Sequence, residues 1–279
     1  MYYEYYIAMP TRGRVDRQHT LNKLVPELRK YVNVYCHPGE LLALSNYWGD
    51  KVASMQEYDV NCKTIGEIRE YIIFNSHAKN VIFLDDNLRF QTTIKPSRNN
   101  LLKGSVFEMI EKNYFPEEIL QMQIQIFDWM FEKLKNYAMC GLSFRPSNRG
   151  GIKGEKENCR LFGIWGINVK KYLSQEIRFS DYPIKEDFAV AISLIKNGYN
   201  TICTYDYSFD KSSGANSAGG CSKYRTIQLS NEIALKLQEM FPDWVKLKIK
   251  ERKNWDGEFK GVESMDVIIY WNKIRKDET

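Results

Sequence analysis

The sequence has no C-x-x-C pair, and its six cysteines are scattered along 279 residues. This spacing indicates neither a zinc site nor a disulfide framework, so we expect reduced thiols. The N-terminal residues lack a basic start followed by a long apolar core, and no apolar run approaches the roughly 18 residues of a membrane span. We therefore expect an unprocessed cytoplasmic protein without a membrane partner.

A large excess of either charge is also absent. Forty Lys and Arg against 35 Asp and Glu leave a net charge of +5. This balance permits a polyanionic partner without requiring one. The length suits one α/β domain with a C-terminal extension.

An apolar run at residues 81–84 leads directly into Asp85, Asp86 and Asn87. The pattern predicts a buried strand that brings these side chains to its C-terminal end, where ligands bind in an open α/β sheet. Paired acids at this place suit a divalent cation that carries a phosphate. A solvated turn or a helix cap is the alternative for an Asp-Asp pair.

The N-terminal segment has the layout of a nucleotide site. Residues 5–9 predict a strand that ends at Pro10, and a turn containing glycine leads from it into a helix. Backbone N–H groups at the helix start, together with Arg12 and Arg14, favour an anion. A solvated basic turn is the competing interpretation.

The following residues alternate between predicted strands and helices. Strands are expected at 32–36 and 51–55 with a helix at 39–47 between them, which indicates a mainly parallel sheet with helices on both faces. An amphipathic helix over 64–73 leads into the central strand. Its Arg69 either points back towards the same crevice or is an exposed helix arginine.

The middle of the chain contains a basic loop. An irregular connection is expected at 91–113, then a helix at 116–136 and a strand at 138–144. Residues 145–156 follow with three glycines and four basic residues. Such a segment can close over a ligand or lie along a phosphate backbone, or it is a flexible solvated loop.

Two acids, Glu186 and Asp187, stand at the predicted start of a helix that stops at 197–200. Helix N–H groups and the field of a metal would keep a carboxylate there ionised and available as a base. Helix capping alone would explain one of the two acids.

The C-terminal part has two basic features. The small-residue loop 212–225 ends in Lys223 and Arg225 and is suited to fold over a diphosphate, or it is a linker. After a helix at 226–240, residues 244–250 alternate and place three lysines on one strand face. These lysines either follow the phosphates of a duplex or protect an edge strand, and 267–271 is the expected returning strand.

Taken in order, these motifs resemble the GT-A fold of nucleotide-sugar glycosyltransferases, especially the inverting enzymes of the large family 2 group, over about residues 5–205. Residues 10–14 are similar to the first nucleotide loop of that family, and 83–87 to its Asp-x-Asp metal motif. Gly66 with Arg69 resembles the donor helix, one residue short. Residues 163–171, 186–187 and 198–199 resemble the acceptor strand and the Glu-Asp helix, whose aspartate is the catalytic base. Asn87 departs from the aspartate that is usual at its position.

The resemblance implies an α/β GT-A domain at 1–225, with a donor half at about 1–90 and an acceptor half at about 91–225, and a helix and β-hairpin extension at 226–279. It implies Asp187 as general base, with Glu186 beside it. A divalent Mn or Mg ion is expected at Asp85, Asp86 and Asn87. The expected donor-binding residues are Pro10, Thr11, Arg12, Arg14, Arg69, Asp85, Asp86, Lys223 and Arg225. The expected acceptor-binding residues are Arg145, Arg149, Lys153, Trp165 and Gly166.

The size, the basic loops and the compact extension are most similar to phage glycosyltransferases that decorate hydroxymethylated pyrimidines in DNA, including the TET-associated group. The resemblance implies transfer of a hexose or pentose from a nucleotide sugar, preferably a UDP-sugar, to the hydroxyl of 5-hydroxymethylpyrimidine in DNA. It also implies that the protein acts in the host cytoplasm. It gives no expectation for the oligomeric state. The alternatives are a glycosyltransferase acting on a polysaccharide or lipid-linked glycan, and a catalytically silent nucleic-acid-binding module of the same fold.

Overall fold

A computed structural model describes residues 6–93, 107–110, 114–148, 153–212, 219–253 and 260–274. Its central element is a mixed sheet of ten strands in the order β3-β2-β1-β4-β9-β7-β10-β5-β6, with β8 also paired to β10. The strands of this sheet are β1 (Tyr6–Thr11), β2 (Val32–Cys36), β3 (Ser54–Glu57), β4 (Asn80–Leu84), β5 (Leu88–Thr93), β6 (Phe107–Met109), β7 (Met139–Phe144), β8 (Glu155–Glu157), β9 (Ile164–Asn168) and β10 (Thr201–Lys211). The predicted α/β fold class is confirmed.

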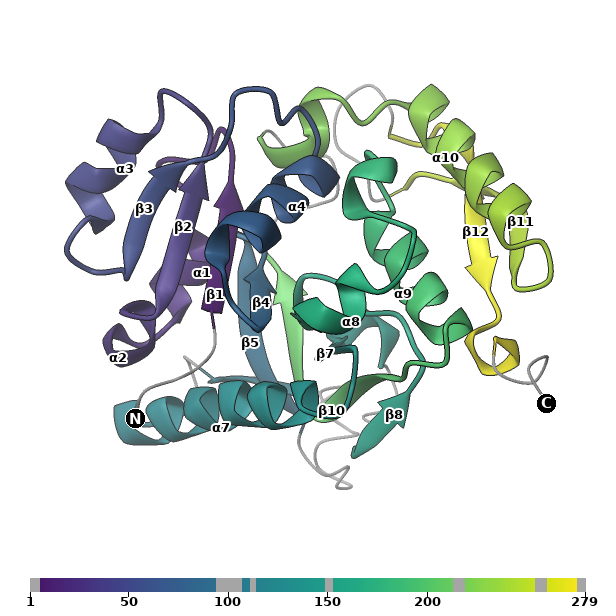
Figure 1. Ribbon diagram of the computed structural model, residues 1–279. Helices are drawn as coiled ribbons and strands as arrows, with labels where there is room; N and C mark the ends of the chain where they lie inside the picture. The colour runs from purple at the N-terminus through teal and green to yellow at the C-terminus, as the bar shows by residue number, and fades with distance from the viewer. Residues whose placement is uncertain are drawn as a thin grey trace.

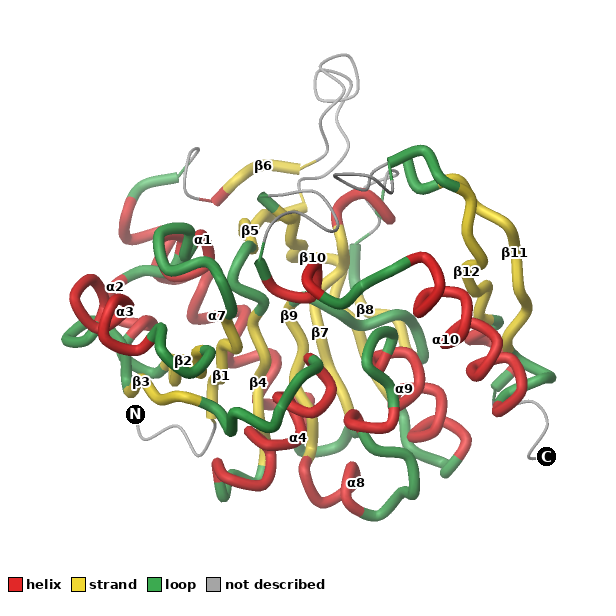
Figure 2. The backbone as a smooth tube through the Cα atoms, turned by 90° about the horizontal axis from the view of Figure 1, so that it is seen from above, coloured by secondary structure: helices red, strands yellow, loops and turns green. Residues whose placement is uncertain are grey.

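Helices cover both faces of this sheet (Figures 1 and 2). The α-helices are α1 (His19–Lys23), α2 (Pro26–Arg29), α3 (Leu41–Trp48), α4 (Ile65–Ser76), α7 (Pro116–Leu134), α8 (Val169–Leu173), α9 (Glu186–Lys196) and α10 (Ile227–Met240). Alternate residues of β1 point to opposite faces, as the strand period requires. Ile7 and Met9 enter a core with α1, α2, α3 and α7, whereas Ala8 enters a second core with α4, α8 and α9.

The strand directions bring the carboxyl ends of six strands to one edge. The strands β3, β2, β1 and β4 are parallel neighbours, and β7 is parallel to β10. Between these two groups, β9 runs antiparallel to both β4 and β7. The residues that follow β1, β4, β7 and β10, together with those that precede β9, therefore share one edge.

Two sequence predictions for the sheet need correction. The expected irregular connection at 91–113 is wrong at its start, because β5 continues to Thr93 and pairs with β10. It is also wrong at 107–109, where β6 pairs with β5, while 94–106 and 111–113 lie outside the described residues. The strand expected at 51–55 begins only at Ser54. In both places, pairing with a distant strand decides the conformation more than local composition does.

The C-terminal residues form a separate small sheet beside α9 and α10. Strands β11 (Val245–Glu251) and β12 (Glu263–Ile269) are antiparallel, with Leu247 opposite Val267. Figure 1 shows them with α10 at the side of the molecule opposite α3 and β3. A third core joins Ile192 of α9 to Ile233 of α10. None of the helices among the described residues is long and apolar enough to cross a membrane.

Candidate active site

Arg69 connects the two acidic motifs of the chain. Its Nη2 donates to Asp85 Oδ1 at 3.3 Å, and its Nη1 donates to Glu186 Oε1. The side chain is 6% exposed, and its guanidinium carbon lies 5.1 Å from the centroid of the Trp165 ring. The end of β4 and the start of α9 are therefore held at one point by a buried arginine.

The start of α4 explains why Arg69 reaches this point. Thr64 and Glu67 form a capping box that fixes where α4 begins. In the same first turn, Gly66 packs against the 3-10 helix η2 (Phe179–Asp181), and a Cβ at Gly66 would lie 2.1 Å from the Phe179 carbonyl oxygen. The missing side chain lets α4 approach the segment that leads into Glu186.

Asp85 accepts hydrogen bonds from two cationic side chains. In addition to Arg69, Lys211 Nζ at the end of β10 donates to Asp85 Oδ2 at 2.8 Å. Desolvation raises the pKa of Asp85, but the nearby Lys211 and Arg69 outweigh it, and the pKa lies below its ordinary value. Asp85 is thus held as a carboxylate at the edge of the sheet.

Asp86 binds two side chains, one at the end of β1 and one in the turn after it. Thr11 Oγ1 donates to its Oδ2 at 2.7 Å, and Arg14 Nη1 forms an ion pair with its other oxygen. Asp86 is 4% exposed, and desolvation raises its pKa despite the opposing effects of Arg14 and Thr11. The two predicted nucleotide motifs, at 10–14 and 83–87, are therefore in direct contact.

The predicted Mn or Mg ion does not fit this arrangement. The carboxylates of Asp85 and Asp86 already have protein cations as partners, and Asn87 is 6% exposed. In the described part of the chain, no group of three or more His, Cys, Asp and Glu side chains is placed to hold a metal ion. The positive charge at this edge comes from arginine and lysine side chains.

Glu186 and Asp187 occupy the first turn of α9 and differ in environment. Glu186 is 5% exposed, and burial raises its pKa to about 7 although Arg69 acts in the opposite direction. Asp187 is half-buried, and within the described residues no side chain donates a hydrogen bond to it. The charge of Asp187 favours the protonated form of Arg69. The side chain of Asp187, at the start of α9, is thus left available for other contacts.

Lys185 precedes these two acids in an unusual conformation. Its φ of 60° is in the left-handed region, which is uncommon for a residue other than glycine. Its Nζ donates to the carbonyl oxygen of Ser230 at 3.1 Å and to Ser230 Oγ at 3.0 Å. Burial lowers the pKa of Lys185 to about 8. Through this contact, α10 fixes the residue that directly precedes α9.

A small cavity lies between the turn at 10–14 and residues 219–225. Gly220 N donates to Arg12 O at 2.8 Å, and Ile65 N donates to Tyr224 Oη at 2.8 Å. The cavity between these contacts has about 40 Å³, which suits about one water molecule and not a nucleotide. Its lining residues are Pro10, Thr11, Arg12, Ile65, Ile68, Asp86, Gly220, Cys221 and Tyr224. Residues 219–225 therefore cover the predicted donor loop in this conformation.

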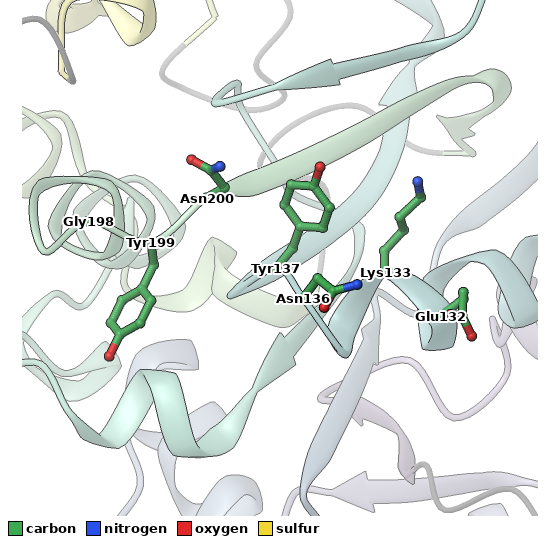
Figure 3. Close-up of a pocket in the computed structure, with 7 residues that line it drawn as sticks. All are labelled: Glu132, Lys133, Asn136, Tyr137, Gly198, Tyr199 and Asn200. Carbon is green, nitrogen blue, oxygen red and sulfur yellow. The ribbon is translucent and has the colours of Figure 1, made fainter.

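A larger hollow of about 530 Å³ lies at the opposite edge of the sheet. Figure 3 shows its lining residues, which are Glu132, Lys133, Asn136, Tyr137, Gly198, Tyr199 and Asn200. They precede β7 and β10, so they lie at the amino ends of strands whose carboxyl ends approach Asp85. Ligands of open α/β sheets bind at the carboxyl ends, so this hollow is not the candidate active site.

The predicted acceptor residues are found in different environments. Arg145 forms an ion pair with Asp210 at 2.6 Å, and Lys153 is exposed. Trp165 and Gly166 need correction, because both are buried in β9 beneath the site and cannot contact an acceptor directly.

Three predicted positions have limited or no description here. Arg149 lies outside the described residues, and the side chain of Lys223 is also outside them. Arg225 is half-buried after the 3-10 helix η3 (Gly220–Lys223), and its charge acts on Glu186 and Lys185. Among the predicted donor residues, Arg225 therefore lies near the acids of α9 and not at the turn after β1.

Sequence reasoning missed two residues of this site, Lys211 and Tyr224. Lys211 is the last residue of β10, and only the pairing of the strands brings it beside Asp85. Tyr224 stands between the two predicted cations Lys223 and Arg225, so a search for charged residues passed over it.

Comparisons with known proteins place the chain in a family. A family model described as "TET-Associated Glycosyltransferase" matches residues 5–220. No curated protein matches the sequence. The chain is similar to the crystal structure of S. aureus TarS 1-349 in complex with UDP-GlcNAc, with 12% identity and a TM-score of 0.47, covering 84% of this chain and 66% of that one. It is also similar to a mycobacterial protein, with 11% identity and a TM-score of 0.44, covering 95% and 83% of the two chains. The chain thus spans less than two thirds of the TarS fragment.

Proposed function

The chain belongs to the TET-associated glycosyltransferase family, and on this premise we propose that it transfers a sugar from a nucleotide sugar to the hydroxyl group of 5-hydroxymethylpyrimidine in DNA. A UDP-sugar is the donor that we favour. The observation that carries the proposal is the double contact of Arg69 with Asp85 and Glu186. It supports a single crevice with a donor side at β4 and an acceptor side at α9.

Asp187 is the proposed general base. It would accept the proton of the acceptor hydroxyl while the oxygen attacks the anomeric carbon and the nucleoside diphosphate leaves. Such a base must come within about 3 Å of the hydroxyl in the bound complex. The half-buried position of Asp187 at the start of α9, with Glu186 already engaged by Arg69, supports this assignment.

The leaving diphosphate needs positive charge at the other side of the crevice. Arg14 and Lys211 lie at the carboxyl ends of β1 and β10, held there by Asp86 and Asp85. Preorganised donors of this kind are typically worth about 3–4 kcal/mol each, or roughly a hundredfold or more in rate. These side chains would serve the charge stabilisation that the sequence assigned to a metal ion.

Donor entry would require residues 219–225 to move. The cavity beneath them is smaller than a nucleotide, and two hydrogen bonds, from Gly220 N to Arg12 O and from Ile65 N to Tyr224 Oη, keep it closed. We propose that the nucleotide displaces this segment from the turn at 10–14.

The proposal is tested with purified protein, a panel of nucleotide sugars and DNA that contains 5-hydroxymethylcytosine or 5-hydroxymethyluracil. Nucleosides released from the DNA are then examined by mass spectrometry. A sugar adduct on the modified nucleoside is the expected result, and Asp187→Asn is the matched inactive control. Hydrolysis of the nucleotide sugar without an adduct would point to another acceptor, and DNA binding without turnover would point to a silent module.

A further inference from the structure

Arg160 is an arginine packed against two aromatic rings, one of which belongs to the first turn of α9. Its guanidinium carbon lies 4.1 Å from the centroid of the Phe162 ring and 4.7 Å from that of Phe188. The side chain is nevertheless exposed. Contacts with two rings restrict a long side chain that would otherwise be mobile, so the guanidinium is preorganised.

The position of Arg160 follows from the direction of β9. Residues 160–163 precede this strand, and Gly163 O accepts a hydrogen bond from Asp85 N at 2.8 Å. Phe162 also lies 5.5 Å from Lys211 Nζ, the cation that binds Asp85. Phe188 directly follows Asp187 in α9. Arg160 is therefore between the donor-side carboxylate and the proposed base.

The guanidinium N–H groups of Arg160 are available as hydrogen-bond donors. In the described part of the chain, no group accepts a hydrogen bond from the Arg160 side chain. Desolvation lowers the pKa of Arg160, and the charges of Asp187 and Asp266 act in the opposite direction. Asp266 is largely balanced by other cations, since Arg252 Nη1 lies 3.2 Å and Lys250 Nζ 3.7 Å from its Oδ2.

We propose that Arg160 binds a phosphate group of the acceptor DNA, next to the nucleotide whose hydroxyl reaches Asp187. This inference rests on the proposed function of the Asp187 site. A guanidinium packed against two rings offers its N–H groups as contact points, and these match the oxygens of a phosphate in pairs. Phosphate contacts of this kind position a nucleic acid without reading its sequence. The exposed Lys248 on β11 adds positive charge beyond Asp266.

The test compares Arg160→Gln and Arg160→Lys with the wild type on two acceptors. One acceptor is a single-stranded oligonucleotide with 5-hydroxymethylcytosine, and the other is the free nucleoside 5-hydroxymethyl-2′-deoxycytidine, which has no phosphate. Arg29→Gln is the matched control, because the guanidinium carbon of Arg29 also packs on an aromatic ring, 5.7 Å from the centroid of Trp48. That ring belongs to α3. The nucleotide-sugar hydrolysis rate without acceptor checks that the donor side is intact.

For Arg160→Gln we expect the KM for the oligonucleotide to rise roughly tenfold or more, because a charge-assisted contact is lost. The slope of log KM against log salt should fall by about 0.7, the value for one phosphate contact on a single strand. The KM for the nucleoside should stay within about twofold. Arg160→Lys should keep the salt slope but raise the KM, since lysine has no planar pair of donors.

Two results would overturn the inference while leaving the proposed function intact. One is an oligonucleotide KM and salt slope that Arg160→Gln leaves unchanged in an enzyme that still glycosylates DNA. The other is an equal rise of KM for oligonucleotide and nucleoside, which would mean that Arg160 positions Asp187 or the base. If the wild type hydrolyses its donor and never modifies DNA, the proposed function fails and the inference fails with it.

Discussion

Arg69 and Glu186 form a buried ion pair across 117 positions of the sequence, between α4 and the first turn of α9. Removal of one partner from such a pair leaves an uncompensated buried charge, which typically costs about 3–5 kcal/mol. We therefore expect Arg69→Met to lower the free energy of unfolding by about this amount in urea titrations. The double variant Arg69→Met/Glu186→Gln should recover part of the loss, and additive losses would show that the two side chains do not interact.

Glu186 should make stability depend on pH in a defined direction. Burial raises its pKa from 4.5 to about 7, so the folded protein holds this proton more tightly than the unfolded chain does. Its contribution to stability is therefore complete below pH 4.5 and is lost as the pH rises through 7. Glu186→Gln cannot ionise, so its stability should fall less than that of the wild type as the pH rises over this interval. Unfolding midpoints at several pH values measure the difference, and parallel curves would contradict the assignment.

Asp187→Asn should abolish transfer with little effect on the fold. General base catalysis contributes typically 10²–10⁴-fold, so we expect a loss of kcat in that range with unchanged binding of the nucleoside diphosphate. Asp243→Asn, at an exposed position before β11, is the matched control. A variant at position 187 that retains the wild-type kcat would remove Asp187 from the mechanism.

Lys211→Met should weaken donor binding. The change removes a cation 2.8 Å from Asp85 Oδ2 and leaves that carboxylate with Arg69. Lost hydrogen bonds to charged groups cost about 1.5–3 kcal/mol, which corresponds to roughly a 10- to 100-fold weaker affinity for the nucleoside diphosphate. Isothermal titration calorimetry measures this, with Lys170→Met in α8 as an exposed control. Equal affinities for both variants and the wild type would exclude Lys211 from the donor site.

Gly66→Ala should destabilise the fold although alanine favours helices. The added Cβ would lie 2.1 Å from the Phe179 carbonyl oxygen and 2.7 Å from that of Tyr182, so α4 would have to shift. Overpacking of this type typically costs about 1–3 kcal/mol or more. Asn75→Ala, at an exposed position of the same helix, should change stability by no more than about 0.5 kcal/mol. Thermal unfolding of both variants gives the comparison.

Where local pattern and chemistry agree, the sequence predicted the elements that form the candidate site. The apolar run before Asp85 reads as a buried strand in any context, and the β4 bounds match it. The paired acids at the start of α9 lie where the helix signals placed them. The contact of Arg69 with both acidic motifs depends on how α4 crosses the sheet. From the sequence, an Arg69 that points back towards the site was only one of two alternatives, the other being an exposed helix arginine.

Other features depend on pairing and burial that no local pattern contains. Trp165 and Gly166 were assigned to the acceptor because the strand around them fits a family motif, but β9 lies between β4 and β7 and both its faces are covered. Gln91 and Thr93 look like loop residues, yet they are buried in β5, which pairs with both β10 and β6. Lys211 became visible only when β10 brought it beside β4.

The contact between Lys185 and Ser230 bears on how this enzyme could be re-engineered. Because α10 anchors the left-handed residue that opens α9, the C-terminal extension acts as a brace for the helix that presents Asp187. Chimeras that join the N-terminal part of one homologue to the extension of another should keep both partners from the same parent. A crossover between positions 185 and 230 would take Lys185 and Ser230 from different parents, so the contact that anchors the start of α9 could be lost.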